Sequence, residues 1–226
     1  MCGRFALFID LNTLIEAFGL SLNVPPGAIT PRYNIAPSQQ VVGICQNADG
    51  FRRLKSFRWG LIPHWAKDAS IGNRLINARS ETVHEKPSFR QALRYRRCLI
   101  PANGFFEWVR EDKGKQPYFI RRKDQAPLAF AGLWESWKGP EGTIESCTIL
   151  TTEANALIAP IHDRMPVILS PPEYDLWLDR EVDDPGKLQL LFQPIPGELL
   201  EMQPVSAVVN NPQHEGEKCV ARIEGS

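Results

Sequence analysis

Hydrophobic and polar residues follow two different periods along this chain, and these periods predict where helices and strands form. Between residues 10 and 18, apolar residues recur at the i, i+3, i+4, i+7 spacing of one helix face, at Leu11, Leu14, Ile15 and Phe18. Gly19 follows as a C-terminal stop signal. We therefore expect an amphipathic helix over 10–18 whose apolar face belongs to the core.

From residue 41 onward, short β-prone runs dominate, and turn signals separate most of them. The predicted strands span 41–46, 54–59, 98–109, 118–122, 128–137, 147–152, 166–169 and 202–209. Helices are expected at about 88–95, capped by Ser88, and at about 172–178, opened by Ser170 or Pro171. This order favours an α+β fold, a single domain with a curled, barrel-like, mainly antiparallel β core and peripheral helices.

The 226 residues, 43% of them hydrophobic, are enough to bury the core of one such domain spanning 1–226. The polar segment from about 210 to 226 is expected to be loosely held. The apolar run at 5–9 is too short to span a membrane, and it lacks the basic start and the cleavage site of a signal peptide. A cytoplasmic or nuclear protein without a membrane partner is therefore predicted.

Charge is distributed unevenly, although the net charge is zero. Residues 1–123 carry 20 of the 26 Lys and Arg, whereas residues 124–226 carry 17 of the 26 Asp and Glu. A neutral protein can still bind a polyanion through a local basic face, and the basic runs at 52–53, 94–97 and 121–123 are candidates for one. Alternatively, the two halves form salt bridges with each other; the sequence leaves both interpretations open.

The cysteines do not indicate a disulfide framework or a metal site. They are odd in number, widely spaced and without a CxxC pair, at Cys2, Cys45, Cys98, Cys147 and Cys219. We therefore expect neither a disulfide framework nor a zinc site.

Cys2 differs from the other cysteines because it directly follows the initiator methionine. Removal of Met1 would leave an α-amine with a pKa of ~7.7–8.0 beside a thiol with a pKa of ~8.5. An aldehyde can form an imine with this amine, and the sulfur can then attack the imine carbon and close a five-membered thiazolidine. A small buried cysteine without function is the alternative, so this hypothesis needs support from the rest of the chain.

Two titratable residues lie in suggestive surroundings. Glu107 stands between Phe106 and Trp108, and aromatic surroundings can raise the pKa of a carboxyl group toward the range of a general acid or base. Strand alternation could instead point Glu107 to solvent. His162, beside Asp163, could protonate a sugar oxygen or hold a phosphate, or it could be a structural histidine.

Other polar and aromatic residues have the chemistry of a nucleotide site. Asn77 and Arg79 would share one face of an extended segment, where an amide and a guanidinium can orient a hydroxyl and a phosphate. Pro37, Trp65 and Trp108 offer apolar surfaces for stacking a base. The alternatives are a turn-stabilising Asn, a surface Arg and packing of the rings in the core.

Six short motifs contain all of these residues except Trp65 and follow one another along nearly the whole chain. They are MCGRF at 1–5, RYNIAP at 32–37, WGLIP at 59–63, INARSET at 76–82, GFFEW at 104–108 and IHDRMPVIL at 161–169. Together they resemble the SOS response-associated peptidase (SRAP) family, whose members shield abasic DNA by covalent crosslinking. The resemblance implies a stand-alone, bacterial-type, monomeric protein that is nucleoid-associated when bound to DNA.

The resemblance assigns residues motif by motif. It places the catalytic residues at Cys2, Asn77, Glu107 and His162. It places contacts to single-stranded DNA at Gly3, Arg4, Asn34, Pro37, Trp65, Arg79, Trp108 and Arg164. Some relatives carry two adjacent tryptophans where this chain has Trp65-Ala66, so the exclusion of duplex DNA is left open.

The implied substrate is an abasic site in single-stranded DNA, whose sugar opens to an aldehyde. His162 would protonate the ring oxygen and hold the 3′ phosphate, Glu107 would shuttle protons, and Asn77 would orient the amine or a sugar hydroxyl. Some β-lyase activity from the imine is a side path. No step requires a metal or an organic cofactor, so none is expected. Two other functions stay open: a thiol peptidase or autopeptidase using Cys2, and a non-covalent single-strand binder.

Overall fold

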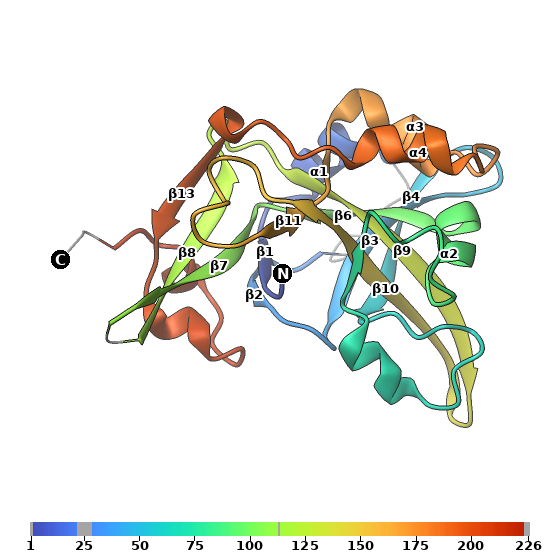
Figure 1. The fold of residues 1–226 in the computed structure, drawn as a ribbon, viewed down its shortest axis with the longest axis horizontal. Helices are drawn as coiled ribbons and strands as arrows, with labels where there is room; N and C mark the ends of the chain where they lie inside the picture. Colours follow the sequence, from blue (N-terminus) through green and yellow to red (C-terminus); the bar gives the residue numbers. More distant parts are fainter. Residues whose placement is uncertain (1, 22–28, 113, 224–226) are drawn as a thin grey trace.

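The computed structural model describes residues 2–21, 29–112 and 114–223, and a closed five-stranded barrel lies at its centre (Figure 1). The order around the barrel returns to its first member: β10 (Gly142–Glu153), β4 (Arg52–Trp59), β3 (Gln40–Gln46), β6 (Arg97–Ala102) and β9 (Leu128–Gly139). Neighbours are antiparallel except β10 and β4, which run parallel. The predicted α+β class with a curled, mainly antiparallel core is confirmed.

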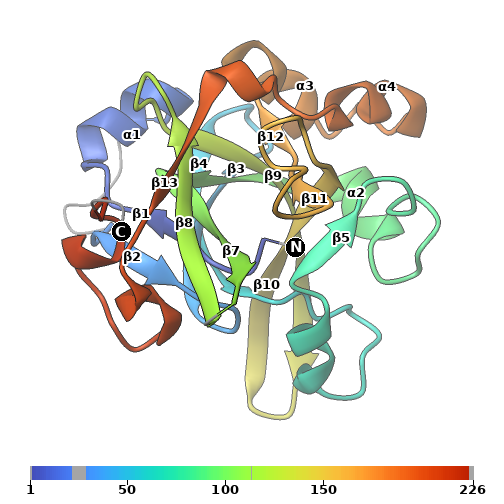
Figure 2. The ribbon, with the colours of Figure 1, turned by 60° about the vertical axis from the view of Figure 1, so that its left-hand side comes forward.

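Shorter strands extend the barrel, and a second sheet packs beside it (Figures 1 and 2). β5 (Asn77–Arg79) and β11 (Arg164–Pro166) pair with β10, and β12 (Ile168–Leu169) pairs with β9. The second sheet is antiparallel, in the order β13 (Leu200–Pro204), β8 (Gly114–Arg122), β7 (Gly104–Glu111), β1 (Phe5–Leu7) and β2 (Arg32–Ile35).

Aromatic rings join the sheet to the barrel. The ring of Phe5 on β1 lies 5.2 Å from that of Trp59 and 5.9 Å from that of Phe130, measured between centroids. Phe105 on β7 also meets Phe130, at 6.1 Å. Edge contacts of this kind favour a tight fit between the two layers, so the chain start is held against the barrel wall.

Helical segments lie at the periphery, and within the described ranges none is long and apolar enough to cross a membrane. The α-helices are α1 (Leu11–Phe18), α2 (Arg90–Tyr95), α3 (Tyr174–Leu178) and α4 (Pro185–Gln189). The 3₁₀ turns are η1 (Ala69–Arg74), η2 (Pro171–Glu173), η3 (Leu190–Phe192), η4 (Gly197–Leu199), η5 (Ala207–Asn210) and η6 (Glu217–Cys219).

The helix predicted over 10–18 is confirmed as α1. The Asp10 side chain caps its start by accepting from the Thr13 N–H at 3.0 Å, and Gly19 ends it with φ +59°. The helix predicted at 172–178 corresponds to η2 and α3, and the Ser170 backbone N–H and hydroxyl both lie 2.6 Å from a Glu173 carboxylate oxygen. The expected Ser88 cap is wrong, because Phe89 occupies the cap position of α2.

The strand predicted over 98–109 is wrong as a single strand. The chain leaves the barrel at Asn103 and enters the second sheet as β7. Asn103 holds this corner, since its side-chain oxygen accepts from the Phe8 and Ile9 N–H groups at 2.6 and 3.2 Å. Gly104 is required next, because a Cβ there would lie 2.4 Å from the Ile120 carbonyl oxygen. The strand predicted over 202–209 likewise ends early, at Pro204.

The segment after residue 210 makes more contacts than the polar composition led us to expect. Cys219 is fully buried, and Val205 pairs with Arg222 in an isolated bridge. Asn34 on β2 donates to the carbonyl oxygens of Asn211 and His214 at 3.0 and 2.8 Å. The backbone of this segment thus satisfies a buried amide from a distant strand, which composition alone cannot reveal.

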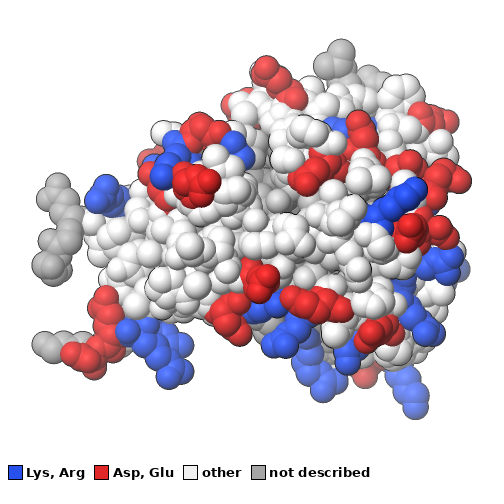
Figure 3. All heavy atoms as spheres, turned by 45° about the horizontal axis from the view of Figure 1, so that its top comes forward, with Lys and Arg blue, Asp and Glu red and all other residues white. Residues whose placement is uncertain are grey.

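The three basic runs are largely paired with acidic residues, and Figure 3 shows both signs interspersed on the face drawn. The ion pairs are Arg52–Asp175, Arg94–Asp183, Arg96–Glu135, Arg121–Glu201 and Arg122–Asp124. Of the two interpretations of the uneven charge, the formation of salt bridges therefore accounts for these arginines.

Candidate active site

Cys2 lies just before β1, and its side chain is fully buried. It packs in the apolar cluster between the barrel and the second sheet, together with Ile149 of β10 and Met165 of β11. The Sγ atom is 4.0 Å from the Arg4 carbonyl oxygen. Burial, reinforced by the charge of the nearby Glu107 carboxylate, raises the pKa of the thiol far above its usual range. The Cys2 thiol is thus protonated at neutral pH.

Glu107 lies on β7, and its side chain is buried rather than turned to solvent. Strand alternation places Phe106 in a separate core cluster with Trp108 packed against it, so Glu107 occupies the opposite face of β7. Burial raises the pKa of Glu107 to about 7, and the charge of Asp163 also acts in this direction. A carboxyl group with this pKa can both accept and release a proton near neutral pH.

His162 stands in the turn before β11. The Arg164 backbone N–H donates to its Nδ1 at 2.9 Å, and an Asp163 carboxylate oxygen lies 3.0 Å from the same nitrogen. The Arg164 N–H requires Nδ1 to accept, whereas the Asp163 carboxylate favours a proton on the same nitrogen, so these two contacts favour different tautomers of the neutral ring. Burial lowers the pKa of His162, which favours the neutral form.

Glu107 and His162 line one pocket of about 570 Å³. Its other walls are Trp108, Val109, Arg110, Lys115, Pro160 and Ile161. This volume lies within the range of small-molecule sites. Cys2 is the third titratable group in this region, because the charge of Glu107 affects the pKa of its thiol.

Asn77 on β5 lies on the opposite side of β10 from β11. Its Nδ2 donates to the Ile149 carbonyl at 3.4 Å, whereas its buried Oδ1 has no hydrogen-bond partner within residues 2–21, 29–112 and 114–223. Ala78 is buried between Asn77 and Arg79, so these two share the other face of the strand, as predicted. Ile76 packs on the cluster that contains Cys2. A buried, unpaired acceptor is costly and favours a donor from a ligand.

Arg164 is nearly buried and engages Glu81 rather than facing an open surface. Its two terminal nitrogens meet the two Glu81 carboxylate oxygens at 2.6 and 2.9 Å, and Nη2 also donates to the Thr151 carbonyl at 2.6 Å. This bidentate pair connects the segment after β5 to β11 across β10. Sequence reasoning did not select Glu81, although it lies within the INARSET motif.

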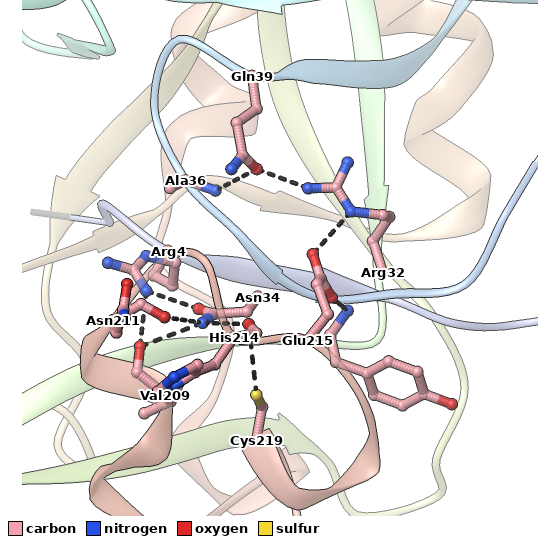
Figure 4. A network of polar contacts seen from close by, with 11 residues as sticks. Arg4, Arg32, Asn34, Ala36, Gln39, Val209, Asn211, His214, Glu215 and Cys219 are labelled. Carbon is pink, nitrogen blue, oxygen red and sulfur yellow. Dashed lines mark hydrogen bonds and ion pairs between the residues drawn. The ribbon is translucent and has the colours of Figure 1, made fainter.

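The expected DNA contacts near the chain start converge on Arg4 (Figure 4). Arg4 Nη1 donates to Asn34 Oδ1 at 2.6 Å, and the Arg4 guanidinium carbon lies 5.7 Å from the centre of the Trp108 ring. Asn34 itself is fully buried, and its amide is used entirely by Arg4 and by backbone carbonyls. In this arrangement the Asn34 side chain supports Arg4 and has no surface for DNA.

The remaining expected contacts lie near or at the surface. Trp65 is 50% exposed, in the loop after β4, and the Trp137 indole N–H holds that loop by donating to the Ala66 carbonyl at 2.8 Å. Arg79 is exposed on β5, whereas Gly3 and Pro37 are half-buried. The structure does not bring Trp65 or Pro37 into the pocket that contains Glu107, within the part of the chain that it describes.

This fold and this site define a class of single-domain β-barrel proteins with a cysteine at the chain start beside a carboxyl group of raised pKa. The chain matches the family described as SOS response associated peptidase (SRAP) over residues 1–212, and it belongs to that family.

Relatives match over nearly their full length. The chain is 46% identical over 222 residues to the abasic site processing protein YoqW of Bacillus subtilis (strain 168), with 97% of this chain and 99% of that protein covered. It is 30% identical to the abasic site processing protein YedK of Escherichia coli (strain K12), with 99% and 100% covered. A crystal structure of a protein from Bacteroides thetaiotaomicron superimposes with a TM-score of 0.88 at 26% identity, covering 99% of this chain and 100% of that one.

Proposed function

We propose that this protein captures abasic sites in single-stranded DNA covalently through Cys2, once Met1 is removed, and so shields the lesion from strand cleavage. The abasic site processing proteins that resemble it along nearly their whole length support a substrate of this class. The observation that carries the proposal is the placement of Cys2 beside Glu107, whose pKa is about 7. The protein would act in the cytoplasm as a monomer.

The protonated thiol favours an order of steps in which the amine reacts first. The amine of Cys2 adds to the aldehyde carbon of the opened sugar, and loss of one water gives an imine. The sulfur then adds to the imine carbon, its proton passes to the ring nitrogen, and the thiazolidine is closed without any change of redox state. Glu107 suits both proton transfers because its pKa lies near neutral pH.

His162 and Asn77 have complementary roles in this scheme. His162 donates a proton to the ring oxygen of the closed sugar and promotes opening to the aldehyde. Asn77 supplies its unpaired Oδ1 as an acceptor for the Cys2 amine or a sugar hydroxyl. Opening of the ring is required because the open-chain form alone carries the reactive carbon.

Contacts to the DNA strand are proposed around this site. Arg4 and the exposed Arg79 are suited to phosphates, and Trp65 and Trp108 to stacking of bases. Gly3 and Pro37 would contact the strand next to the lesion, and Arg164 would contribute only if its pair with Glu81 opens. The raised pKa of the Cys2 thiol gives less support to a thiol peptidase, which needs a thiolate.

Substitution of Cys2 tests the proposed chemistry. An abasic single-stranded oligonucleotide is expected to raise the intact protein mass by the mass of the oligonucleotide less one water. Cys2→Ala should bind the oligonucleotide without a denaturation-resistant adduct, because the sulfur is missing. Cys2→Ser should form an imine that borohydride traps, without the stable ring. The measurement is denaturing electrophoresis with intact-protein mass spectrometry.

A matched thiol provides the control. Cys45 is also buried but lies on β3, and Cys45→Ala should form the adduct as the parent protein does. A stable adduct with Cys2→Ala, or with a protein whose N-terminus is permanently acetylated, would show that the proposed chemistry is wrong.

A further inference from the structure

The segment 207–219 contacts several of the expected DNA-binding residues, and we call it the C-terminal brace. It runs from η5 to η6 and lies beside β2 (Figure 2). Residues 207–212 lie within the part of the chain that matches the family, and residues 213–219 lie beyond it.

Among the described residues, the hydrogen bonds of the Arg4 side chain go to neutral oxygen atoms. Its Nη1 donates to Asn34 Oδ1 at 2.6 Å and to the Val209 carbonyl of the brace at 2.7 Å. No carboxylate forms an ion pair with Arg4 within the described ranges, whereas Arg32, Arg94 and Arg164 all have one. A half-buried guanidinium oriented without a counter-ion indicates a site for an anion, such as a phosphate.

Asn34 couples Arg4 to the brace. The fully buried amide uses its oxygen for Arg4 and its nitrogen for three brace carbonyls, those of Val209, Asn211 and His214, at 3.3, 3.0 and 2.8 Å (Figure 4). An amide with this many partners has one allowed orientation. The brace therefore fixes Asn34, and Asn34 fixes Arg4.

Two more connections run from the brace to the surface. The Trp108 indole N–H donates to Asn210 Oδ1 at 2.6 Å, which sets the ring beside Arg4. Glu215 pairs with Arg32 at 2.7 Å, and Arg32 also donates to Gln39 Oε1 at 2.6 Å.

The Gln39 connection continues into the loop that carries Pro37. Gln39 Oε1 accepts a hydrogen bond from the Ala36 backbone N–H at 3.1 Å, so the end of β2 and the loop after it are linked through Arg32 to Glu215 (Figure 4). Two side chains of the brace, Asn210 and Glu215, thus reach Trp108 and, through Arg32, the loop after β2.

We propose that the C-terminal brace pre-orients the DNA-binding surface and that Asn34 is a positioning residue acting through Arg4, which binds a backbone phosphate of single-stranded DNA. Asn210 sets the stacking face of Trp108, and Glu215 sets the Pro37 loop. The inference rests on the proposed function for the identity of the ligand. Pre-organisation of this kind lowers the conformational cost of binding.

Salt dependence provides a test that a purely structural role would not affect. Binding of fluorescent, undamaged single-stranded DNA is measured at several NaCl concentrations with variants in the Cys2→Ala background. Each lost phosphate contact reduces the slope of log K against log salt by about 0.7. We expect this reduction for Arg4→Gln, the same reduction for Asn34→Ala, and no further reduction for the double variant.

The matched control is Asn103→Ala, which removes another amide that holds the segment after β1 without touching Arg4. It should lower the unfolding free energy and leave the slope unchanged. Asn210→Ala changes an exposed residue, and it should weaken binding severalfold at an unchanged slope because only the Trp108 contact is released. This variant tests the brace even if Asn34→Ala does not fold.

Two results would overturn the proposal: a parental slope with Asn34→Ala, or parental affinity with Asn210→Ala. Additive effects of Arg4→Gln and Asn34→Ala would equally contradict it. Because the assay uses undamaged DNA and no Cys2 thiol, its outcome is independent of whether the covalent adduct forms.

Discussion

At the scale of single residues, Glu107 combines a chemical advantage with an energetic cost. Its side chain is buried on the face of β7 opposite to Phe106 and Trp108, and this burial brings its pKa to about 7. The same desolvation that makes Glu107 a proton shuttle disfavours its charged form in the folded state. A residue suited to the chemistry is therefore expected to destabilise the fold at higher pH.

Substitution of Glu107 by Gln should reveal this cost as a pH-dependent gain in stability. The folded-state pKa of about 7 exceeds the ordinary value of 4.5, so the folded protein binds the proton more tightly than the unfolded chain. Stability from this group is present at low pH and is lost as the pH rises to about 7. At about pH 8, urea unfolding should show Glu107→Gln to be more stable than the parent by up to about 3 kcal/mol.

The gain should shrink as the pH falls and vanish below about pH 4.5, where both states hold the proton. Glu111→Gln, at an exposed position of the same strand, serves as control and should follow the parental pH profile. Glu107→Gln should also slow adduct formation by roughly 10²-fold or more, because the shuttle is lost. An equal stability difference at both pH values would contradict the assigned burial effect.

At the scale of elements, the Arg164–Glu81 pair stabilises strands that are too short to hold their own positions. β5 and β11 each have three residues, and they pair with overlapping parts of β10. β5 carries Asn77, and His162 precedes β11. The ion pair across β10 therefore keeps Asn77 and His162 at fixed positions relative to each other.

Substitution of Arg164 by Ala should lower the unfolding free energy by about 2–3 kcal/mol, because charge-assisted hydrogen bonds of a nearly buried guanidinium are lost. The effects of Arg164→Ala and Glu81→Ala on urea unfolding should be non-additive, since both remove one interaction. Arg122→Ala breaks a surface pair with Asp124 and should change stability by less than about 1 kcal/mol. Fully additive effects of the two substitutions would show that the pair does not couple the strands.

Periodicity predicted the elements that are long enough to show it. Helix α1 and the barrel strands follow from their apolar patterns, whereas β1, β2 and β5 have only three or four residues and give no periodic signal. The corner between β6 and β7 was missed because the apolar run continues through it, although the Asn103-Gly104 dipeptide is a turn signal.

The candidate site shows the same limit. The motifs supply Cys2, Asn77, Glu107 and His162 as chemical types, but the supporting contacts depend on the fold. Arg164 meets Glu81 across 83 positions of sequence, and Asn34 meets Asn211 across 177. No local pattern in the sequence predicts such pairs. The burial of Asn34 and Arg164 could therefore not be predicted from the sequence.

At the scale of the whole molecule, the fold brings opposite charges of the two halves together in several ion pairs. Arginines of the basic runs at 52–53, 94–97 and 121–123 pair with carboxylates from the acidic half. A paired arginine adds little to the field that attracts DNA, because its partner cancels it beyond about one Debye length of ~8–10 Å. The cations that remain for DNA are those without such partners.

Arg79 and Arg94 allow this argument to be tested with one matched pair of substitutions. Both are exposed, but Arg94 pairs with Asp183 at 2.7 Å, whereas Arg79 has no ion pair within the described residues. Arg79→Gln should reduce the slope of log K against log salt for single-stranded DNA by about 0.7, and Arg94→Gln should leave it unchanged. Equal slopes for the two variants would mean that local pairing does not decide which arginines bind DNA, and that the excess charge of the first half acts as a whole.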